Sequence, residues 1–197
     1  MNFIIFGEIG AGKDTAAEIL AELFNSEIVK LGKRIRHDVD KLYTILPDPP
    51  NKRKLYQDYG QGMRQIFGQD LWNLVLYHSI KEGLEQSKSF VIADGRQPNE
   101  YTFWTNQGFI PVGLVADEEI RKARVKARDG FDQSHMFNHE TEINARHIIK
   151  RIKDLEPTTN KAIIIENNGT IDDLRKEIIN KCQQFVSITP TYRGGGL

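Results

Sequence analysis

The sequence predicts a three-layer α/β fold, in which a doubly wound parallel sheet is covered by helices on both faces. Short apolar runs bounded by glycine or polar residues alternate with longer segments of helical apolar spacing. Strands buried on both faces produce such runs, and parallel strands need long crossover connections, usually helices. The first apolar run also leads directly into a glycine-rich turn that ends in lysine, residues 7–13.

The chain is predicted to open with a strand and the first crossover helix. Residues 2–6 read NFIIF and meet Gly7 at once, which is typical of a strand buried on both faces. The absence of a basic start argues against a signal peptide. Residues 15–24 place apolar side chains three and four positions apart, and this spacing favours an amphipathic helix.

The next part of the chain is predicted to be helical and basic. A helix within residues 29–46 has to end before Pro47, because proline cannot continue a helix. Two more helices are predicted at residues 54–67 and 71–84. Asp70 is the expected N-cap of the second of them, since aspartate is a preferred residue at that position.

A strand, a helix and another strand are predicted next. Residues 89–94 read SFVIAD, the second run of a buried strand. Residues 99–107 are predicted to be helical, and Gly108 is suited to end that helix because glycine readily adopts the left-handed conformation. Residues 109–115 read FIPVGLV and form the third predicted strand.

The last part of the chain combines charged helices with one more strand. A helix capped by Asp117 is predicted to run to a loop at residues 129–134. Helices at residues 140–153 and 171–185 flank a fourth predicted strand at residues 162–165. Because ligands bind at the carboxyl ends of strands in such sheets, the chemistry is expected just after each strand.

Composition restricts the classes of function. The 197 residues are expected to form one domain over residues 1–187, with a flexible tail at 188–197. Basic and acidic residues number 27 each, and a net charge of 0 argues against a nucleic-acid-binding coat. No apolar run approaches the length of a membrane span. The single Cys182 excludes an intrachain disulfide framework, and a cytoplasmic protein is expected.

The glycine-rich turn has the pattern of a phosphate-binding loop. Residues 7–15 read GEIGAGKDT, which matches G-x-x-x-x-G-K between a strand and a helix. In such a loop the backbone N–H groups face inward, the helix N-terminus adds partial positive charge and the lysine neutralises phosphate oxygens. ATP is therefore the expected cofactor. The residues expected to bind it here are Gly7, Gly10, Ala11, Gly12, Lys13, Asp14 and Thr15.

Asp14 stands where serine or threonine is usual in this pattern. Its carboxylate can hold Mg²⁺, directly or through water, because this cation prefers oxygen ligands. Alternatively, it only complements the positive end of the helix dipole. The sequence leaves both interpretations open. Thr15 can supply a hydroxyl group to the α-phosphate.

The chain resembles the phage-type deoxynucleoside monophosphate kinases, which belong to the P-loop nucleoside monophosphate kinase group. The loop ending in GKDT carries the resemblance first. Further matches follow in order over most of residues 1–170: RKLYQDYG at 53–60 with Arg64, DLW at 70–72, VIADGRQPNE at 91–100 and HETE at 139–142. The family usually has a second acidic residue where this chain has Ala93.

The resemblance implies ATP- and Mg²⁺-dependent phosphorylation of a (deoxy)nucleoside monophosphate to the diphosphate. It implies a helical acceptor-binding insertion at about residues 29–86 and a lid at about 117–139. A small-molecule acceptor is then the expected partner, with neither nucleic acid nor membrane. The residues expected to bind the acceptor are Arg36, Arg64, Trp72, Arg96 and Glu142. The expected catalytic residues are Lys13, Asp94, Arg96, Arg124 and Arg128, with Asp14 and Asp94 as metal positions.

Charge explains why these residue types suit phosphoryl transfer. The planar guanidinium of Arg96 can make a bidentate contact with a phosphate, and Asp94 can position a Mg²⁺-bound water or the acceptor phosphate. Arg121, Arg124 and Arg128 share one helix face and can neutralise the transferring group without water. Alternatively, Asp94 and Arg96 only mark a strand end that is capped by a turn. The three arginines on the helix can equally belong to a surface helix stabilised by salt bridges.

Asn167, Asn168 and Gly169 follow the last strand and resemble the loop that receives the adenine in this group. A plain strand-to-helix turn explains the same residues. This loop is therefore a second, weaker expectation for nucleotide binding.

Several other functions are considered. A phosphomevalonate kinase-like or dephospho-coenzyme A kinase-like enzyme shares this architecture but uses another acceptor. A nucleotide-binding switch is the rival from another class, although the guanine-reading string N-K-x-D is broken at Ile163. His135 and His139 are four residues apart, but the string H-E-x-x-H fails at Ile143, which excludes that metalloprotease motif.

Overall fold

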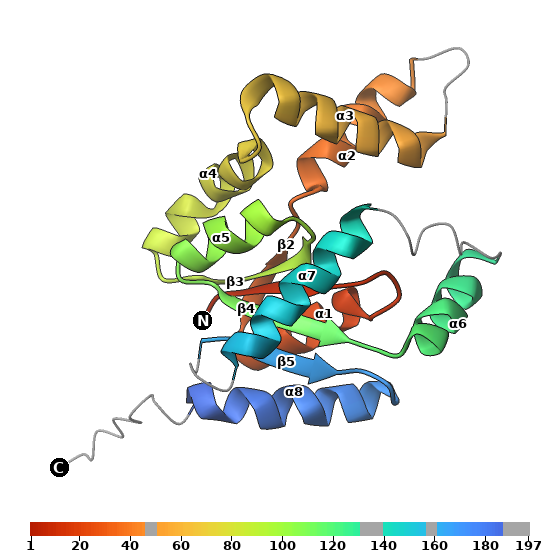
Figure 1. Ribbon diagram of the computed structural model, residues 1–197. Helices are drawn as coiled ribbons and strands as arrows, with labels where there is room; N and C mark the ends of the chain where they lie inside the picture. Colours follow the sequence, from red (N-terminus) through yellow and green to blue (C-terminus); the bar gives the residue numbers. More distant parts are fainter. Residues whose placement is uncertain (46–50, 131–139, 157–160, 187–197) are drawn as a thin grey trace.

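A five-stranded parallel sheet forms the centre of the computed structural model, which describes residues 1–45, 51–130, 140–156 and 161–186 (Figure 1). The strands lie in the order β2-β3-β1-β4-β5, and all their pairings are parallel. Their bounds are β1 (Phe3–Gly7), β2 (Ser26–Val29), β3 (Ser89–Gly95), β4 (Ile110–Val115) and β5 (Ile163–Glu166). The predicted doubly wound parallel sheet is confirmed.

Helices cover both faces of this sheet, as predicted. Figure 1 shows α5 and α7 crossing the near face, while α1 lies behind the strands and α8 runs along the β5 side. The bounds are α1 (Lys13–Phe24), α2 (Lys33–Tyr43), α3 (Lys52–Phe67), α4 (Leu71–Glu85), α5 (Pro98–Asn106), α6 (Glu118–Asp129), α7 (Glu140–Leu155) and α8 (Ile171–Val186). Each overlaps a segment predicted to be helical.

Two hydrophobic cores lie on the two faces of the sheet because successive strand residues point in opposite directions. Phe3 and Ile5 belong to the core under α1 and α8. Ile4 and Phe6 belong to the core under α4, α5 and α7, which is centred on the fully buried Trp104. Burial of this apolar surface, at about 25 cal/mol per Å², holds the strand ends in place.

The edge strand β2 was not predicted. It pairs with β3 in the register Ser26 with Ser89 to Val29 with Ile92. Of its four residues only Val29 is buried. An edge strand that exposes most of its side chains lacks the apolar run by which the inner strands were recognised.

The segment expected to form the helical insertion contains α2, α3 and α4. Figure 1 shows α2 and α3 projecting beyond the sheet, whereas α4 returns beside α5 and contributes Leu76 and Ile80 to the core on that face. Hydroxyl groups on α3 hold it against α2. Tyr56 donates to Asp40 at 2.7 Å, and Tyr59 donates to Asp38 at 3.3 Å.

The two residues predicted as N-caps lie at the N-cap positions of their helices, but their side chains do not cap the backbone. Neither the Asp70 nor the Asp117 carboxylate accepts a hydrogen bond from a backbone N–H at the start of its helix. The Asp70 carboxylate instead accepts hydrogen bonds from Asn73 and Asn99, both at 2.9 Å. At Gly108 the prediction is confirmed, because φ is +80° directly after α5.

Some predictions fall on residues that the structure does not describe. These are most of the loop that follows Pro47, the loop at 129–134 beyond Gly130, and the tail at 188–197. Among the described residues, no helix combines the length and the apolar character that crossing a bilayer requires.

Candidate active site

The loop between β1 and α1 depends on two glycines in the left-handed region. Gly10 has φ +78° and Gly12 has φ +93°. A Cβ atom on Gly10 would lie 2.5 Å from the carbonyl oxygen of Arg121, and one on Gly12 would lie 2.5 Å from the side-chain nitrogen of Asn167. Both the conformation and the close approach therefore require glycine, which places the loop N–H groups at the start of α1.

The amino group of Lys13 lies over its own loop. It donates to the carbonyl oxygen of Gly7 at 2.6 Å and to that of Glu8 at 3.1 Å. Burial and, to a lesser extent, the charge of Arg96 lower the pKa of Lys13 to about 8. Gly95, directly before Arg96, pairs with Phe6, directly before the phosphate loop, so Lys13 and Arg96 belong to neighbouring strand ends. Two neighbouring cations in a partly buried place favour the binding of an anion.

Contacts with α6 and α7 hold the outer side of the loop. The N–H of Ile9 donates to Glu142 at 2.6 Å, and the buried Arg121 donates to the carbonyl of Ile9 at 3.4 Å. The carboxylate of Glu8 is paired with Arg121 at 3.2 Å and with Arg146 at 2.9 Å. Arg121 is therefore a structural residue, although it shares a helix face with the expected lid arginines.

Two residues expected to bind the acceptor have other partners. Glu142 is buried and accepts the Ile9 N–H described above, so it positions the phosphate loop. Trp72 is also buried, and its indole N–H donates to the carbonyl of Gly60 at 3.0 Å. It joins α4 to α3 through this bond and through a ring contact with Tyr59. These contacts give both residues a structural role that was not predicted, and their contact with the acceptor stays a prediction.

The loop after β5 contacts the phosphate loop through Asn167, and this contact was not predicted. The side-chain amide of Asn167 donates to the carbonyl of Ala11 at 2.9 Å and is buried. Its neighbour Asn168, one of the residues expected near the adenine, accepts the N–H of Asp117 at 2.8 Å. The sequence shows two asparagines at this strand end, and nothing local distinguishes the one that turns inward.

Asp14 has a partner in addition to the helix dipole. Its carboxylate lies 2.6 Å from the ammonium of Lys30, which directly follows β2. Burial alone would raise the pKa of Asp14, but the hydrogen bond and charge of Lys30 outweigh it, and the pKa lies below the ordinary value. The Asp14 side chain is 74% exposed, so its oxygens remain accessible to a cation. Next to it, Thr15 lies partly buried in the first turn of α1.

Asp94 joins the end of β3 to the start of α2. One oxygen accepts the N–H of Leu31 at 2.7 Å, and the other accepts the N–H of Gly32 at 3.0 Å. This structural role was not predicted. Each carboxylate oxygen keeps a second lone pair, and the expected contact with Mg²⁺ stays a prediction.

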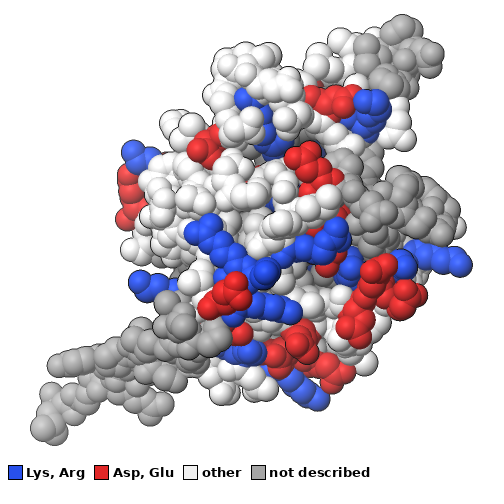
Figure 2. Space-filling view, in the orientation of Figure 1, with Lys and Arg blue, Asp and Glu red and all other residues white. Residues whose placement is uncertain are grey.

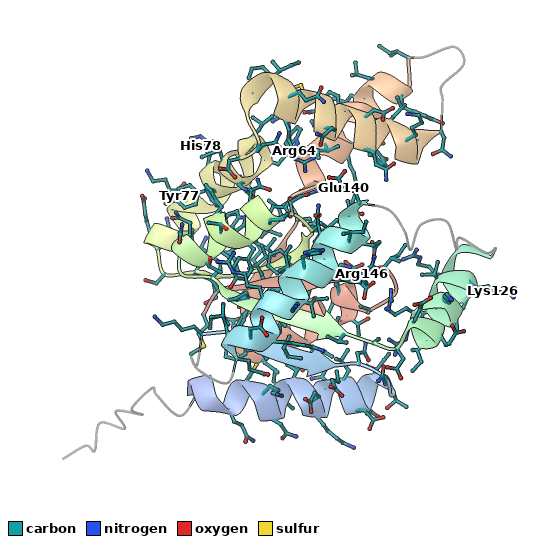
Figure 3. The ribbon with its side chains drawn as sticks, viewed as in Figure 1. Arg64, Tyr77, His78, Lys126, Glu140 and Arg146 are labelled. Carbon is teal, nitrogen blue, oxygen red and sulfur yellow. The ribbon has the colours of Figure 1, made fainter. Side chains whose placement is uncertain are left out.

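Three arginines expected at the acceptor come from three elements. Arg96 follows β3 and is half-buried, Arg64 lies on α3 with 16% of its side chain exposed, and Arg36 lies on α2 near Gly32. Figure 3 shows Arg64 on the side of α3 that faces the start of α7 at Glu140. Glu100 lies between the first two: it accepts the N–H of Arg96 at 2.6 Å and approaches Arg64 to 3.9 Å.

The expected lid arginines lie apart from this group. Arg124 donates to the carbonyl of Asn167 at 2.9 Å and to that of Gly169 at 3.2 Å, so it lies against the loop after β5. The expected contact of Arg124 with the transferring group stays a prediction. Arg128 is exposed in the last turn of α6, while His135, His139 and the rest of the expected lid from residue 131 onward lie outside the described residues.

The face of the molecule seen in Figure 2 carries separate clusters of basic and acidic side chains. Figure 2 shows basic side chains gathered over α7 in the middle of this face, with acidic side chains beside them. The pattern agrees with a net charge of 0 and with local anion binding.

Comparisons with known proteins find a matching family model and solved structures with a similar fold. A family model described as AAA domain matches residues 4–145. The crystal structure of TT1252 from Thermus thermophilus aligns with a TM-score of 0.63 at 18% identity, covering 96% of this chain and 98% of that one. A gluconokinase from Sinorhizobium meliloti 1021 aligns with a TM-score of 0.53 at 12% identity, covering 94% and 93%. An unliganded sugar kinase from Janibacter sp. HTCC2649 aligns with a TM-score of 0.54 at 13% identity, covering 96% and 95%. No curated protein matched the sequence.

Proposed function

This chain belongs to the AAA domain family, and from that membership and the geometry of the site we propose that it is a phosphotransferase that uses ATP to phosphorylate a (deoxy)nucleoside monophosphate. One observation carries the proposal. The phosphate loop with Lys13 and the strand end with Arg96 are neighbours, because Phe6 of β1 pairs with Gly95 of β3. A donor-phosphate site and a second anion site therefore adjoin each other.

The donor side fits a nucleotide triphosphate. Backbone N–H groups of the loop and the start of α1 supply hydrogen bonds, and Lys13 can exchange the carbonyls of Gly7 and Glu8 for phosphate oxygens. Asn167, Asn168 and Gly169 border the loop on the side expected to take the base. Arg124 lies against these residues and thus belongs to the base end of the site.

The residues also fit Mg²⁺, which takes oxygen ligands and keeps several waters. Asp14 is accessible next to the phosphate lysine, and Asp94 lies at the neighbouring strand end. When bound, the cation would neutralise charge on the phosphates. Asp14 would hold it, and Lys30 would keep the unliganded carboxylate in place.

The acceptor side favours a phosphate as the group that is phosphorylated. Arg96 follows β3, Arg64 lies on α3 and Arg36 lies on α2, and in the proposed site these three arginines hold the acceptor phosphate. An acceptor phosphate is ionised near neutral pH, so the site has to neutralise charge and needs no strong general base. Arg128, at the end of α6, is the remaining candidate for charge that develops during transfer.

A coupled assay of ADP release tests this function. The acceptor panel contains all ribo- and deoxyribonucleoside monophosphates, together with phosphomevalonate, dephospho-coenzyme A and gluconate. We expect ADP release that depends on a nucleoside monophosphate. Release with gluconate alone would instead indicate a sugar kinase, in line with the similar gluconokinase and sugar kinase folds. Slow release that no acceptor stimulates would indicate a switch.

A further inference from the structure

A buried carboxylate lies behind the acceptor arginines. Glu100 is only 5% exposed, in the first turn of α5. One of its oxygens accepts two backbone N–H groups, that of Arg96 at 2.6 Å and that of Gln97 at 2.8 Å. The same oxygen therefore caps α5 and fixes the backbone from which the Arg96 side chain leaves.

The other oxygen of Glu100 faces Arg64. It lies 3.9 Å from the nearest guanidinium nitrogen, which is an ion-pair contact but too long for a hydrogen bond. Arg64 comes from α3 in the insertion, and Glu100 comes from α5 in the body, so one carboxylate links the two parts. The N–H donors on that side of Arg64 are held electrostatically and remain able to bond an anion.

The surroundings of Glu100 make its negative charge costly. Burial raises the pKa of Glu100 to about 7, against the effect of the two N–H bonds, and the nearby Asp94 raises it while Arg64 lowers it. From α7, the neutral Asn144 reaches Gln97 at 2.9 Å. The neighbouring charges that change the pKa of Glu100 most are those of Asp94 at the end of β3 and Arg64 on α3.

We propose that Glu100 is the positioning residue of the acceptor-anion site, fixing the backbone of Arg96 through one oxygen and competing with the acceptor anion for Arg64 through the other. This inference rests on the proposed function and adds a positioning residue to its acceptor site. The two roles are separable, because a neutral amide at the same place keeps an oxygen for the N–H groups but loses the charge.

Anion binding therefore depends on Glu100 in two opposite ways. Loss of the oxygen loosens the backbone of Arg96 and weakens binding. Loss of the charge alone removes a repulsion near the anion and strengthens binding, because unit charges several ångströms apart in a partly buried site interact appreciably. A residue that only stabilised the fold would not produce this change of sign.

Sulfate binding tests the inference, with a non-hydrolysable ATP analogue and Mg²⁺ saturating the phosphate loop. Sulfate keeps two negative charges from pH 5.5 to 8.5, so its own ionisation does not interfere. We expect Glu100→Gln to bind sulfate about threefold or more tightly than the native protein at pH 8, and Glu100→Ala to bind it about threefold or more weakly. Glu156→Gln is the matched control, because Glu156 also accepts a backbone N–H, from Ile164 at 2.9 Å, and pairs with Lys181.

A pH series completes the test. Sulfate affinity of the native protein should fall as the pH rises through 7, because Glu100 ionises, and this step should be absent in Glu100→Gln. Equal weakening in both variants, or a pH step that persists in Glu100→Gln, would overturn the inference. If the ATP analogue does not bind the native protein, the proposed function fails, and this inference fails with it.

Discussion

Lys13 is the residue on which the assignment of the phosphate loop depends most. Lys13→Ala should lower turnover about a hundredfold or more, because it removes a charge acting on the transferring phosphate. The fold should persist, since the amino group donates to two carbonyls of its own loop and does not belong to the hydrophobic core. Steady-state ADP release and a thermal melt measure the two effects. Lys176→Ala, an exposed lysine on α8, is the control. Near-native turnover in Lys13→Ala would contradict the loop assignment.

Replacement of Asp14 distinguishes its two possible roles, as a ligand of Mg²⁺ and as a charge that complements the helix dipole. If Asp14 holds Mg²⁺, Asp14→Asn should raise the Mg²⁺ concentration needed for half-maximal rate. If it only complements the dipole, stability should fall by about 0.3–1 kcal/mol with no change in Mg²⁺ dependence. Asp172→Asn is the matched control, because Asp172 is an exposed carboxylate in the first turn of α8. Identical Mg²⁺ titrations of the native protein and Asp14→Asn would exclude the metal role.

Arg96 and Arg128 should affect different kinetic constants. Arg96 follows a core strand and would hold the acceptor before and during transfer, so Arg96→Ala should mainly raise the acceptor KM. Arg128 ends α6 and would meet charge only as the group moves, so Arg128→Ala should mainly lower kcat. Kinetics with the acceptor varied at saturating ATP compare them. An unchanged acceptor KM in Arg96→Ala would make Arg64 the better candidate for the acceptor clamp.

At the scale of elements, α7 sets the position of the phosphate loop. Glu142 on its first turn bonds the N–H of Ile9, and Arg146 one turn later pairs with Glu8. The helix and the loop are thus held together, although they are far apart in the sequence: Ile9 and Glu142 are separated by 133 positions.

Removing this contact should loosen the loop. Glu142→Ala should cost about 1.5–3 kcal/mol of stability, as for a hydrogen bond to a charged group, and should weaken ATP binding. Glu140→Ala in the same turn is the control, because that side chain is exposed. Urea unfolding and titration with an ATP analogue measure the two effects. A Glu142→Ala protein with native ATP affinity would show that α7 does not position the loop.

At the scale of the whole molecule, Glu100 makes stability depend on pH. Its pKa is about 7 in the fold and near 4.5 when unfolded, so its contribution is complete below 4.5 and is lost as the pH rises through 7. The lost stability is at most about 3 kcal/mol. Urea unfolding at pH 5 and 8 should therefore show a larger decrease for the native protein than for Glu100→Gln. Equal decreases would mean that Glu100 ionises normally.

Local pattern determined the inner strands, the helices and the phosphate loop. Apolar runs such as residues 2–6 and 89–94 identify strands that are buried on both faces, because burial itself selects their residues. The string GEIGAGKDT identifies its loop because glycine conformation and lysine charge are properties of those residues alone. These features could be predicted without any knowledge of distant contacts.

Tertiary structure decided which polar side chains face the site and which brace it. Glu142 and Ile9 are 133 positions apart, and Asn167 and Ala11 are 156 apart, so no local pattern reveals these bonds. The sequence predicted that Trp72 and Glu142 bind the acceptor. In the fold, the side chain of Trp72 bonds the carbonyl of Gly60 and that of Glu142 bonds the N–H of Ile9. The polar edge strand β2, which brings Lys30 to Asp14, was missed for the same reason. A polar group acquires its role from the partner that the fold supplies, whereas an apolar run carries its own preference for burial.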